Sequence, residues 1–196
     1  MKLQIIIGST RPNRVTPRVA KWVAAQAKEL PGTEAELVDL ANYDLPLFNE
    51  PSSPQFTPNR KPETAVDKWL LKLAEADAYV LVTPEYNRST SGVLKNALDY
   101  IDFQFEKKPV ALVGHGSTGG AQAISHLRGI LPGLLAVTVP RATYFSGASE
   151  GLDENGNLSK EIAAKPYGPH TAIKQTLEDL KWYSDALATA RTKDSK

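Results

Sequence analysis

The fold is decided by one stretch of sequence, Leu3-Gln4-Ile5-Ile6-Ile7-Gly8-Ser9-Thr10-Arg11-Pro12-Asn13-Arg14. Its first five residues are apolar except for Gln4, which is typical of a strand buried on both faces. The next seven are turn formers, hydroxyl residues or cations. A helical pattern follows, with Thr16 as the expected N-cap and Pro17 at the first helical position. The sequence therefore predicts a strand, a polar loop and the N-terminus of a helix.

This first loop has the chemistry of an anion site. It offers backbone N–H groups, hydroxyls and two guanidinium groups, and the dipole of the following helix adds to the attraction for negative charge. We therefore interpret it as a phosphate site. The loop lacks the Gly-x-x-x-x-Gly-Lys spacing of a P-loop, so an ordinary strand-to-helix loop with surface arginines is the alternative.

Length and composition exclude several classes of protein. With 196 residues, the chain is long enough for a substantial core, and we expect a single domain over residues 1–196. A net charge of +1 gives no reason to expect a nucleic-acid or membrane surface. The chain has no cysteine and three widely separated histidines, which argues against disulfides, thiolate nucleophiles and metal sites. No membrane span or signal peptide is recognisable, so we expect a cytoplasmic protein.

Four further apolar strands are expected, and they alternate with helical patterns. The strands are Ala35 to Leu40, Ala78 to Thr83, Val110 to Val113 and Leu135 to Val139. Alternation of this kind predicts an α/β fold with a parallel sheet covered on both faces. Right-handed crossovers leave few arrangements, and we expect the flavodoxin-like, three-layer, doubly wound fold with strand order 2-1-3-4-5. That order brings the loops after strands 1, 3 and 4 to one edge of the sheet.

Two other segments carry expectations. Five prolines between Asn42 and Pro62 prevent a regular helix or central strand, and a loop this long is usually functional or packed on a neighbour. We expect this segment and Asp99 to Phe105 to form contact surfaces. Asp153 to Gly156 is expected to be a turn. The final helix carries Ile173 to Leu187, and its charged end after Arg191 is expected to fray.

The loops after strands 3 and 4 suit a flat ligand. Gly114, Gly116 and Gly119 form a literal Gly-x-Gly-x-x-Gly, but Pro140-Arg141 stands where a dinucleotide site needs an acid, so we reject a standard Rossmann site. A hydrolase elbow around Ser117 also fails, because the pattern Gly-x-Ser-x-Gly is not met. The glycines still allow close backbone approach. Pro84-Glu85-Tyr86-Asn87 is either a solvated loop or a support for a planar conjugated ligand.

Several segments together resemble the NADPH-dependent FMN reductase family. They are Gly8-Ser9-Thr10-Arg11, Pro84-Glu85-Tyr86-Asn87, the run from Ser91 to Asp99, and Gly119-Gly120. The resemblance to these flavodoxin-like quinone, azo-dye and chromate reductases covers roughly residues 3 to 150. Its most specific signature is Pro-Glu-Tyr-Asn followed by Gly-x-Leu-Lys-Asn. The chain departs from the family pattern at Ser91, Gly114 and Gln122, which bears on substrate preference and ring contacts.

The resemblance implies which residues bind FMN. The phosphate would be held by the first loop, through Ser9, Arg11, Asn13 and Arg14. The isoalloxazine ring would pack along, and hydrogen-bond to the backbone of, Pro84, Glu85, Tyr86 and Asn87. The other side of the ring would be closed by His115, Gly116, Ser117, Gly119 and Gly120.

The resemblance also implies a mechanism. A hydride would pass from NADPH or NADH to FMN and then, in ping-pong order, to a quinone-like, azo, metal-oxyanion or flavin acceptor. Because the flavin performs the difficult step, no catalytic side chain and no metal are expected. Family members are typically dimers or tetramers, so we expect a homodimer or homotetramer.

Two other functions stay open at this point. The first is a flavodoxin-type electron carrier that does not oxidise NAD(P)H. Such carriers are usually strongly acidic for docking to basic partners, whereas this chain is nearly neutral. The second is a flavin-free regulatory or scaffold protein, because a fold does not fix a function.

Overall fold

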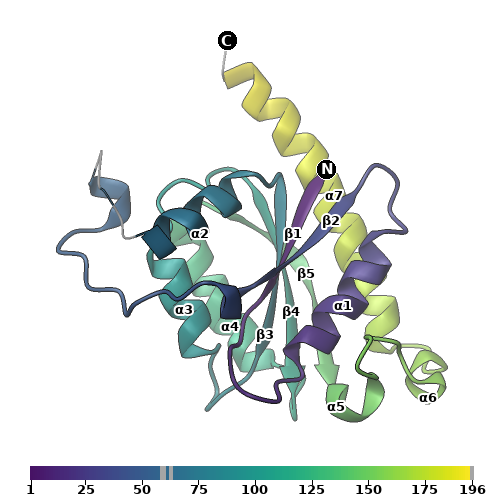
Figure 1. Cartoon of the computed structure of the whole chain (residues 1–196). Helices are drawn as coiled ribbons and strands as arrows, with labels where there is room; N and C mark the ends of the chain where they lie inside the picture. Colours follow the sequence, from purple (N-terminus) through teal and green to yellow (C-terminus); the bar gives the residue numbers. More distant parts are fainter. Residues whose placement is uncertain (58–60, 62–63, 195–196) are drawn as a thin grey trace.

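The chain folds around a five-stranded parallel sheet with the strand order β2-β1-β3-β4-β5, as predicted (Figure 1). The computed structural model describes residues 1–57, 61 and 64–194. Its strands are β1 (Lys2–Ile7), β2 (Glu34–Asp39), β3 (Ala78–Pro84), β4 (Pro109–Gly116) and β5 (Val137–Ser146). Each strand pairs in parallel with its neighbours in the sheet.

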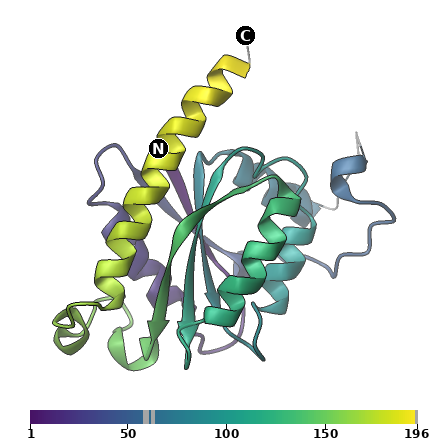
Figure 2. The same cartoon turned by 180° about the vertical axis from the view of Figure 1, so that it is seen from behind.

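Helices cover both faces of this sheet (Figures 1 and 2). One face packs against α1 (Thr16–Ala27) and α7 (Pro169–Asp194). The other packs against α2 (Thr64–Ala74), α3 (Gly92–Asp99) and α4 (Ala121–Ile130). The shorter elements are α5 (Ala148–Gly151), α6 (Lys160–Ala163) and the 3-10 turns η1 (Leu40–Asn42), η2 (Pro54–Phe56) and η3 (Leu131–Leu134). The architecture is therefore the three-layer one expected from the sequence.

The central strands β1, β3 and β4 are almost entirely buried and contribute to two separate cores, whereas the edge strands β2 and β5 are partly exposed. In β1, Ile5 and Ile7 point to the α1/α7 layer, whereas Ile6 points to the α2/α3/α4 layer. Strand side chains alternate between faces, so a continuous isoleucine run is needed to fill both layers. Burying each such side chain stabilises the fold by about 1.5–3 kcal/mol.

Strand β5 is longer than predicted. We expected it to end at Val139, but it continues to Ser146. The Pro140-Arg141 pair was interpreted as a strand end, yet it lies where the β4–β5 register is irregular, between the pairs Val110↔Thr138 and Leu112↔Ala142. Here the guanidinium of Arg128 donates to the carbonyl oxygens of Val139 and Pro140, at 3.1 and 2.6 Å. An edge strand tolerates proline at such an irregularity.

The start of α1 also corrects the sequence interpretation. Thr16 is the first helical residue of α1, and the N-cap is Val15, whose position has no side-chain cap. The final helix, α7, runs to Asp194, and the fraying of its end after Arg191 stays a prediction. It begins near the carboxyl edge of the sheet and extends past the amino edge (Figures 1 and 2). Within it, the Arg191 guanidinium donates to the carbonyl oxygen of Lys107, which stabilises the last turns.

The proline-rich segment after β2 packs on α3. Residues 58–60 and 62 of the predicted Asn42–Pro62 loop lie outside the described residues. The side-chain amide of Asn96 accepts from the Phe48 N–H at 2.8 Å and donates to the Pro46 carbonyl at 2.7 Å. The Asn96 side chain thus satisfies backbone groups of this segment that a neighbouring strand would satisfy in a sheet. The predicted turn at Asp153 to Gly156 is present, closed by the Gly156 N–H on the Asp153 carbonyl.

Candidate functional site

Three loops meet at the carboxyl edge of the sheet, as the strand order predicts. They are the first loop (residues 8–15), the third-strand loop (residues 85–91) and the fourth-strand loop (residues 117–120). Two contacts to Gly8 hold the first loop against the third-strand side. The Gly8 N–H donates to the Val82 carbonyl at 2.8 Å, and the Ser91 hydroxyl donates to the Gly8 carbonyl at 2.5 Å. A Cβ at Gly8 would lie 2.7 Å from the Val82 oxygen, so only glycine allows this approach.

The first loop is linked to the third-strand loop through Ser9, Arg11 and Tyr86. The Ser9 hydroxyl is buried, lies 3.0 Å from the Tyr86 hydroxyl, and accepts from the Arg11 N–H at 3.4 Å. The Arg11 guanidinium lies over the Tyr86 ring, 5.7 Å from its centroid, within the range of a cation–π interaction. The structure therefore brings together three of the residues that the sequence assigns to different parts of the cofactor.

The other two proposed phosphate ligands lie differently. Asn13 adopts the left-handed conformation, with φ of 55°. The Arg14 guanidinium forms an ion pair with Asp39 at the end of β2, with an N–O distance of 2.5 Å. Its Nε atom is buried and has no hydrogen-bond partner in the part of the chain that the structure describes. Arg14 therefore has one charge partner already, whereas no ion pair of Arg11 occurs among the described residues.

Behind the first loop, α1 is joined to β4 by a buried polar contact. The Thr16 hydroxyl lies 3.0 Å from Nε2 of His115, and both side chains are buried. Burial lowers the pKa of His115 to about 4, so this imidazole is neutral at pH 7. A neutral imidazole adds hydrogen-bonding capacity to the site without adding charge.

The third-strand loop is a small hairpin. The N–H groups of Tyr86 and Ser89 each donate to the other residue's carbonyl, at 2.9 and 3.0 Å. The two residues between them, Asn87 and Arg88, have φ of 48° and 68°. Two consecutive left-handed residues are the geometry of a type I′ turn, which fixes the backbone of the segment tightly. Asn is well suited to that conformation, and a strained residue such as Arg88 is common at functional sites.

The glycine-rich segment is partly strand. We expected the loop to start at Gly114, but β4 continues through Gly114, His115 and Gly116. Gly120, with φ of 80°, begins α4, and its Cα faces Gly114 so closely that an added Cβ would lie 2.6 Å from the Gly114 Cα. The packing of the loop itself therefore requires glycine at both positions. His115 and Gly116 lie on the strand, and Ser117, Gly119 and Gly120 lie on the loop beyond it.

Several contacts at this edge were not predicted from the sequence. Ser91 caps α3 by accepting from the Leu94 N–H, in addition to its bond to Gly8. Glu85 and Thr118 contact each other, and His126 contacts Ser89. A serine directly before the apolar helical pattern of α3 was a usable cap signal. The other contacts join residues more than thirty positions apart, for which the sequence contains no local signal.

Two cavities flank the first loop. One, of about 360 Å³, is lined by Val15, Gly147 and the segments 115–117 and 148–150. The other, of about 460 Å³, lies between Thr10, the segments 40–41 and 43–45, and the α3 residues Val93 and Asn96. Both volumes are in the range of small-molecule sites. The first loop therefore has open space on both sides.

Comparison with known proteins settles the family. Residues 1–150 match the NADPH-dependent FMN reductase family. The chain belongs to this family. An NAD(P)H-dependent FMN reductase of Schizosaccharomyces pombe is 34% identical, over 81% of this chain and 86% of its own length. An NADPH azoreductase of a Bacillus species is 36% identical, over 93% and 92%, and a 2-hydroxy-1,4-benzoquinone reductase of a Burkholderia species is 33% identical, over 84% and 89%.

The fold agrees with this assignment. The NAD(P)H:acceptor oxidoreductase FerB of Paracoccus denitrificans superimposes with a TM-score of 0.69 at 24% identity, covering 96% of this chain and 97% of its own. Family membership identifies the chain as an oxidoreductase that uses FMN together with NADPH or NADH. Across residues 1–57, 61 and 64–194, no helix has the length and hydropathy to cross a membrane. The same residues contain no cluster of three or more potential metal ligands.

Proposed function

We propose that this flavoenzyme passes a hydride from NADPH or NADH through FMN to small organic acceptors in ping-pong order, with FMN held where the three loops meet. The observation that carries the proposal is the convergence of Arg11, Ser9 and Tyr86, two of which lie on the loop that leads into α1. Unpaired cationic charge, hydroxyls and backbone N–H groups at a helix N-terminus favour a phosphate.

The residues of the site divide into three groups under this proposal. The first loop would bind the phosphate through Ser9, Arg11, Asn13 and Arg14. The third-strand hairpin would present the backbone of residues 84–87 to the polar edge of the ring, because its type I′ turn fixes those groups in advance. Residues 115–117, 119 and 120 would line the opposite side. Bound FMN supplies the two-electron chemistry, and the protein supplies binding, orientation and electrostatics.

Quinone-like and azo compounds are the acceptor classes that we propose first. Support comes from the relatives that are named as benzoquinone and azo reductases and match more than four fifths of this chain. Metal oxyanions and free flavin are the further classes that we propose. His115 is neutral at pH 7, so this imidazole adds no charge that would select among acceptors.

We propose in addition that the chain acts as a homodimer or homotetramer in the cytoplasm. Large apolar side chains are exposed along the two segments that the sequence analysis assigned to contacts. Leu47 and Phe56 are 83% and 82% exposed, and Phe103 is 53% exposed. The Gln55 amide donates to the Asp102 carbonyl at 3.3 Å, so the two segments touch. Large exposed apolar side chains on segments that contact each other support an interface between copies of the chain.

An absorbance spectrum tests the function. The protein is incubated with FMN, desalted and then given NADPH without oxygen. We expect flavin bands that are retained and that bleach on addition of NADPH. Flavin that is retained but stays oxidised would favour an electron carrier and contradict the reductase proposal. Loss of all flavin on desalting would contradict the assignment of the three loops. Light scattering on the same sample tests the oligomer, and a monomeric mass would contradict it.

A further inference from the structure

The start of α4 lacks a cap of its own. Its N-cap residue is Gly120, which has no side chain to accept from the free N–H groups of the first turn. No other residue fits there, because a Cβ at Gly120 would lie 2.6 Å from the Gly114 Cα and 2.7 Å from the His115 nitrogen. The close packing that demands glycine thus leaves the helix without the usual Ser, Thr, Asp or Asn.

Glu85, from the third-strand loop, supplies the missing acceptor. Its Oε2 accepts from the Gln122 N–H at 2.9 Å, and Gln122 is the second helical residue of α4. Its Oε1 accepts from the Thr118 hydroxyl at 3.2 Å. A carboxylate is also favoured by the positive end of the helix dipole. One side chain therefore joins the third-strand loop, the fourth-strand loop and α4.

Other contacts reinforce this connection along the length of the hairpin. At its base, the Glu85 N–H donates to the His115 carbonyl at 3.0 Å, and a Cβ at Gly116 would lie 3.5 Å from the Glu85 Cβ. Near its tip, the Ser89 hydroxyl lies 3.0 Å from Nδ1 of His126, which is about one helical turn after Gln122 in α4. The third-strand hairpin is thus attached to β4 and α4 at both of its ends.

We propose that Glu85 is a positioning residue whose carboxylate sets the separation between the two loops on either side of the flavin ring. This inference rests on the proposed function, because the ring is what lies between the loops. Both carboxylate oxygens already accept hydrogen bonds from the protein, so Glu85 acts on the ring through the loops that it joins. Its negative charge lies beside the site and opposes the gain of negative charge when the flavin is reduced.

The test compares Glu85→Ala, Glu85→Gln and Thr118→Val with the wild type, and uses Glu178→Gln as the control. Glu178 is an exposed carboxylate on α7. Three quantities are measured: hydrogen exchange of the Gln122 amide in the flavin-free protein, the Kd for FMN, and the midpoint potential of bound FMN. Exchange reports the cap, the Kd reports the loop separation, and the potential reports the charge.

We expect Glu85→Ala to speed exchange of the Gln122 amide by about 5-fold, which corresponds to the loss of one helix cap. FMN should bind more weakly by a similar factor, and the potential should rise. Glu85→Gln keeps one acceptor oxygen but loses the charge, so exchange should change less while the potential rises as much. Thr118→Val should weaken FMN binding without shifting the potential. The control should match the wild type in all three measurements.

Three outcomes would overturn the inference. Unchanged exchange in Glu85→Ala would mean that Glu85 is not the cap. Faster exchange with an unaltered Kd and potential would make Glu85 a structural cap only. Weaker FMN binding with unaltered exchange would mean that the side chain contacts FMN directly. If the wild type retains no FMN, the proposed function fails and the positioning role with it, whereas the exchange measurement still decides whether Glu85 caps α4.

Discussion

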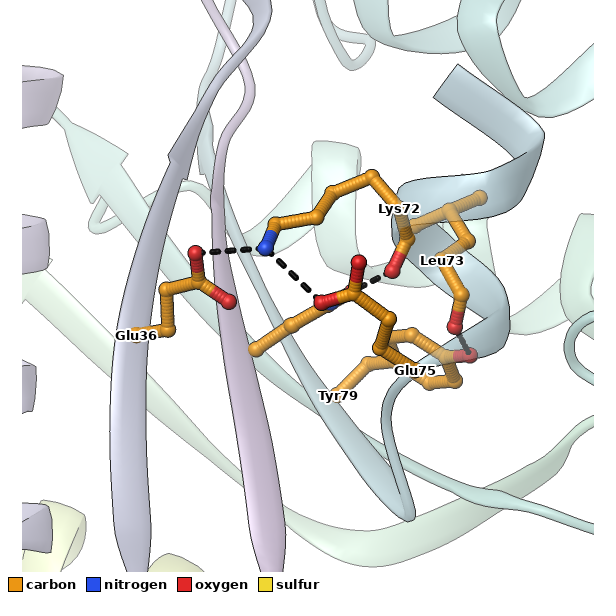
Figure 3. A network of polar contacts seen from close by, with 6 residues as sticks. Glu36, Lys72, Leu73, Glu75 and Tyr79 are labelled. Atoms are coloured by element: carbon orange, nitrogen blue, oxygen red, sulfur yellow. Dashed lines mark hydrogen bonds and ion pairs between the residues drawn. The ribbon is translucent and has the colours of Figure 1, made fainter. Parts of the chain in front are cut away.

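The two edges of the sheet use polar residues in opposite ways. At the amino edge, long charged side chains pair with one another: Lys72 bridges Glu36 and Glu75 at 2.7 and 2.8 Å (Figure 3). These hydrogen bonds, that to Glu36 first, raise the pKa of Lys72. Nearby, the Tyr79 hydroxyl donates to the Leu73 carbonyl at 2.5 Å. These contacts connect α2 to the sheet, and the side-chain amide of Gln4 adds a bond from its Nε2 to the Lys72 carbonyl, while its Oε1 is buried without a partner among the described residues.

Charged contacts also occur at the carboxyl edge, at the Arg14–Asp39 ion pair and at Glu85, but many links between the loops run through short hydroxyl side chains and the backbone. Ser9, Thr16 and Ser91 bridge loops through single hydroxyls, and the turns rely on glycine and on left-handed residues. Loops at this edge of a parallel sheet are where ligands bind in such folds. The amino edge thus relies on ion pairs between long side chains, whereas the carboxyl edge relies chiefly on backbone geometry and short side chains. Four predictions test this difference.

The largest effect is expected from Gly120→Ala at the carboxyl edge. The new methyl group would meet the Gly114 Cα at 2.6 Å in a backbone with φ of 80°, so both overpacking and strain oppose it. We expect a loss of about 3 kcal/mol in unfolding free energy, together with loss of FMN retention. Urea unfolding measures the first and desalting the second. The control is Gly129→Ala, also in α4, where nothing lies within 4 Å of the new Cβ.

In that control, alanine should stabilise the helix by about 0.5–1 kcal/mol. Equal tolerance of alanine at both positions would mean that the Gly114–Gly120 approach is not a constraint, and the contrast between the edges would lose its main support.

The next effect concerns the pH dependence of stability through His115. Its pKa in the folded protein is lowered to about 4, below the ordinary value of about 6.5, so the unfolded chain takes up the proton first as the pH falls. Stability should therefore be unaffected by this group above pH 6.5 and should decrease between pH 6.5 and 4, by at most about 3 kcal/mol. His115→Gln should remove this part of the acid sensitivity.

Unfolding curves of the two proteins at pH 7 and pH 4.5 measure the difference, since the carboxylates common to both cancel. An identical pH dependence in the wild type and in His115→Gln would contradict a buried, neutral imidazole.

Arg11→Ala is expected to act on the cofactor more than on the fold. Removing a charged hydrogen-bond donor from a phosphate costs about 2 kcal/mol, which corresponds to a Kd for FMN that is weaker by about 30-fold. Fluorescence titration with FMN measures it, with Lys28→Ala at the exposed end of α1 as the matched loss of a cation. Unchanged affinity in Arg11→Ala would remove Arg11 from the phosphate site.

The smallest effect is expected at the amino edge from Lys72→Met. Glu36 and Glu75 are about half exposed, so solvent screens both ion pairs, and we expect a loss of less than about 1 kcal/mol. The Kd for FMN should not change. A shift in FMN affinity measured by the same titration would mean that the two edges are coupled and that Lys72 also affects the cofactor site.

The sequence predicted the order of the sheet well, because the central strands β1, β3 and β4 are apolar runs followed by turn residues. It predicted less well where tertiary structure decides. Pro140-Arg141 has the local signature of a strand end, yet Arg128 satisfies the carbonyls there and the strand continues. Thr16 has the sequence signature of an N-cap, yet its hydroxyl forms a hydrogen bond with His115, ninety-nine positions away.

The candidate site, too, was predictable where local sequence patterns define it and not where contacts between distant residues do. The three loops were found from their composition and order, and the candidate residues came from family motifs. The bond from Glu85 to the start of α4 could not be found this way, because it joins residues 37 positions apart. One indirect signal existed: a pair of glycines directly before an apolar helical pattern leaves the helix without a cap, and an acceptor must come from elsewhere.

The irregular register of β5 has a consequence for insertions and deletions. From Val110 to Leu112 the strand β4 advances by two residues, while β5 advances by four, from Thr138 to Ala142. The two extra residues are one full period of side-chain alternation, so Val139 and Phe145 still belong to the same core. At this place the chain can gain or lose residues in pairs without turning its core outward, whereas a single deletion would invert everything from Ala142 to Ser146.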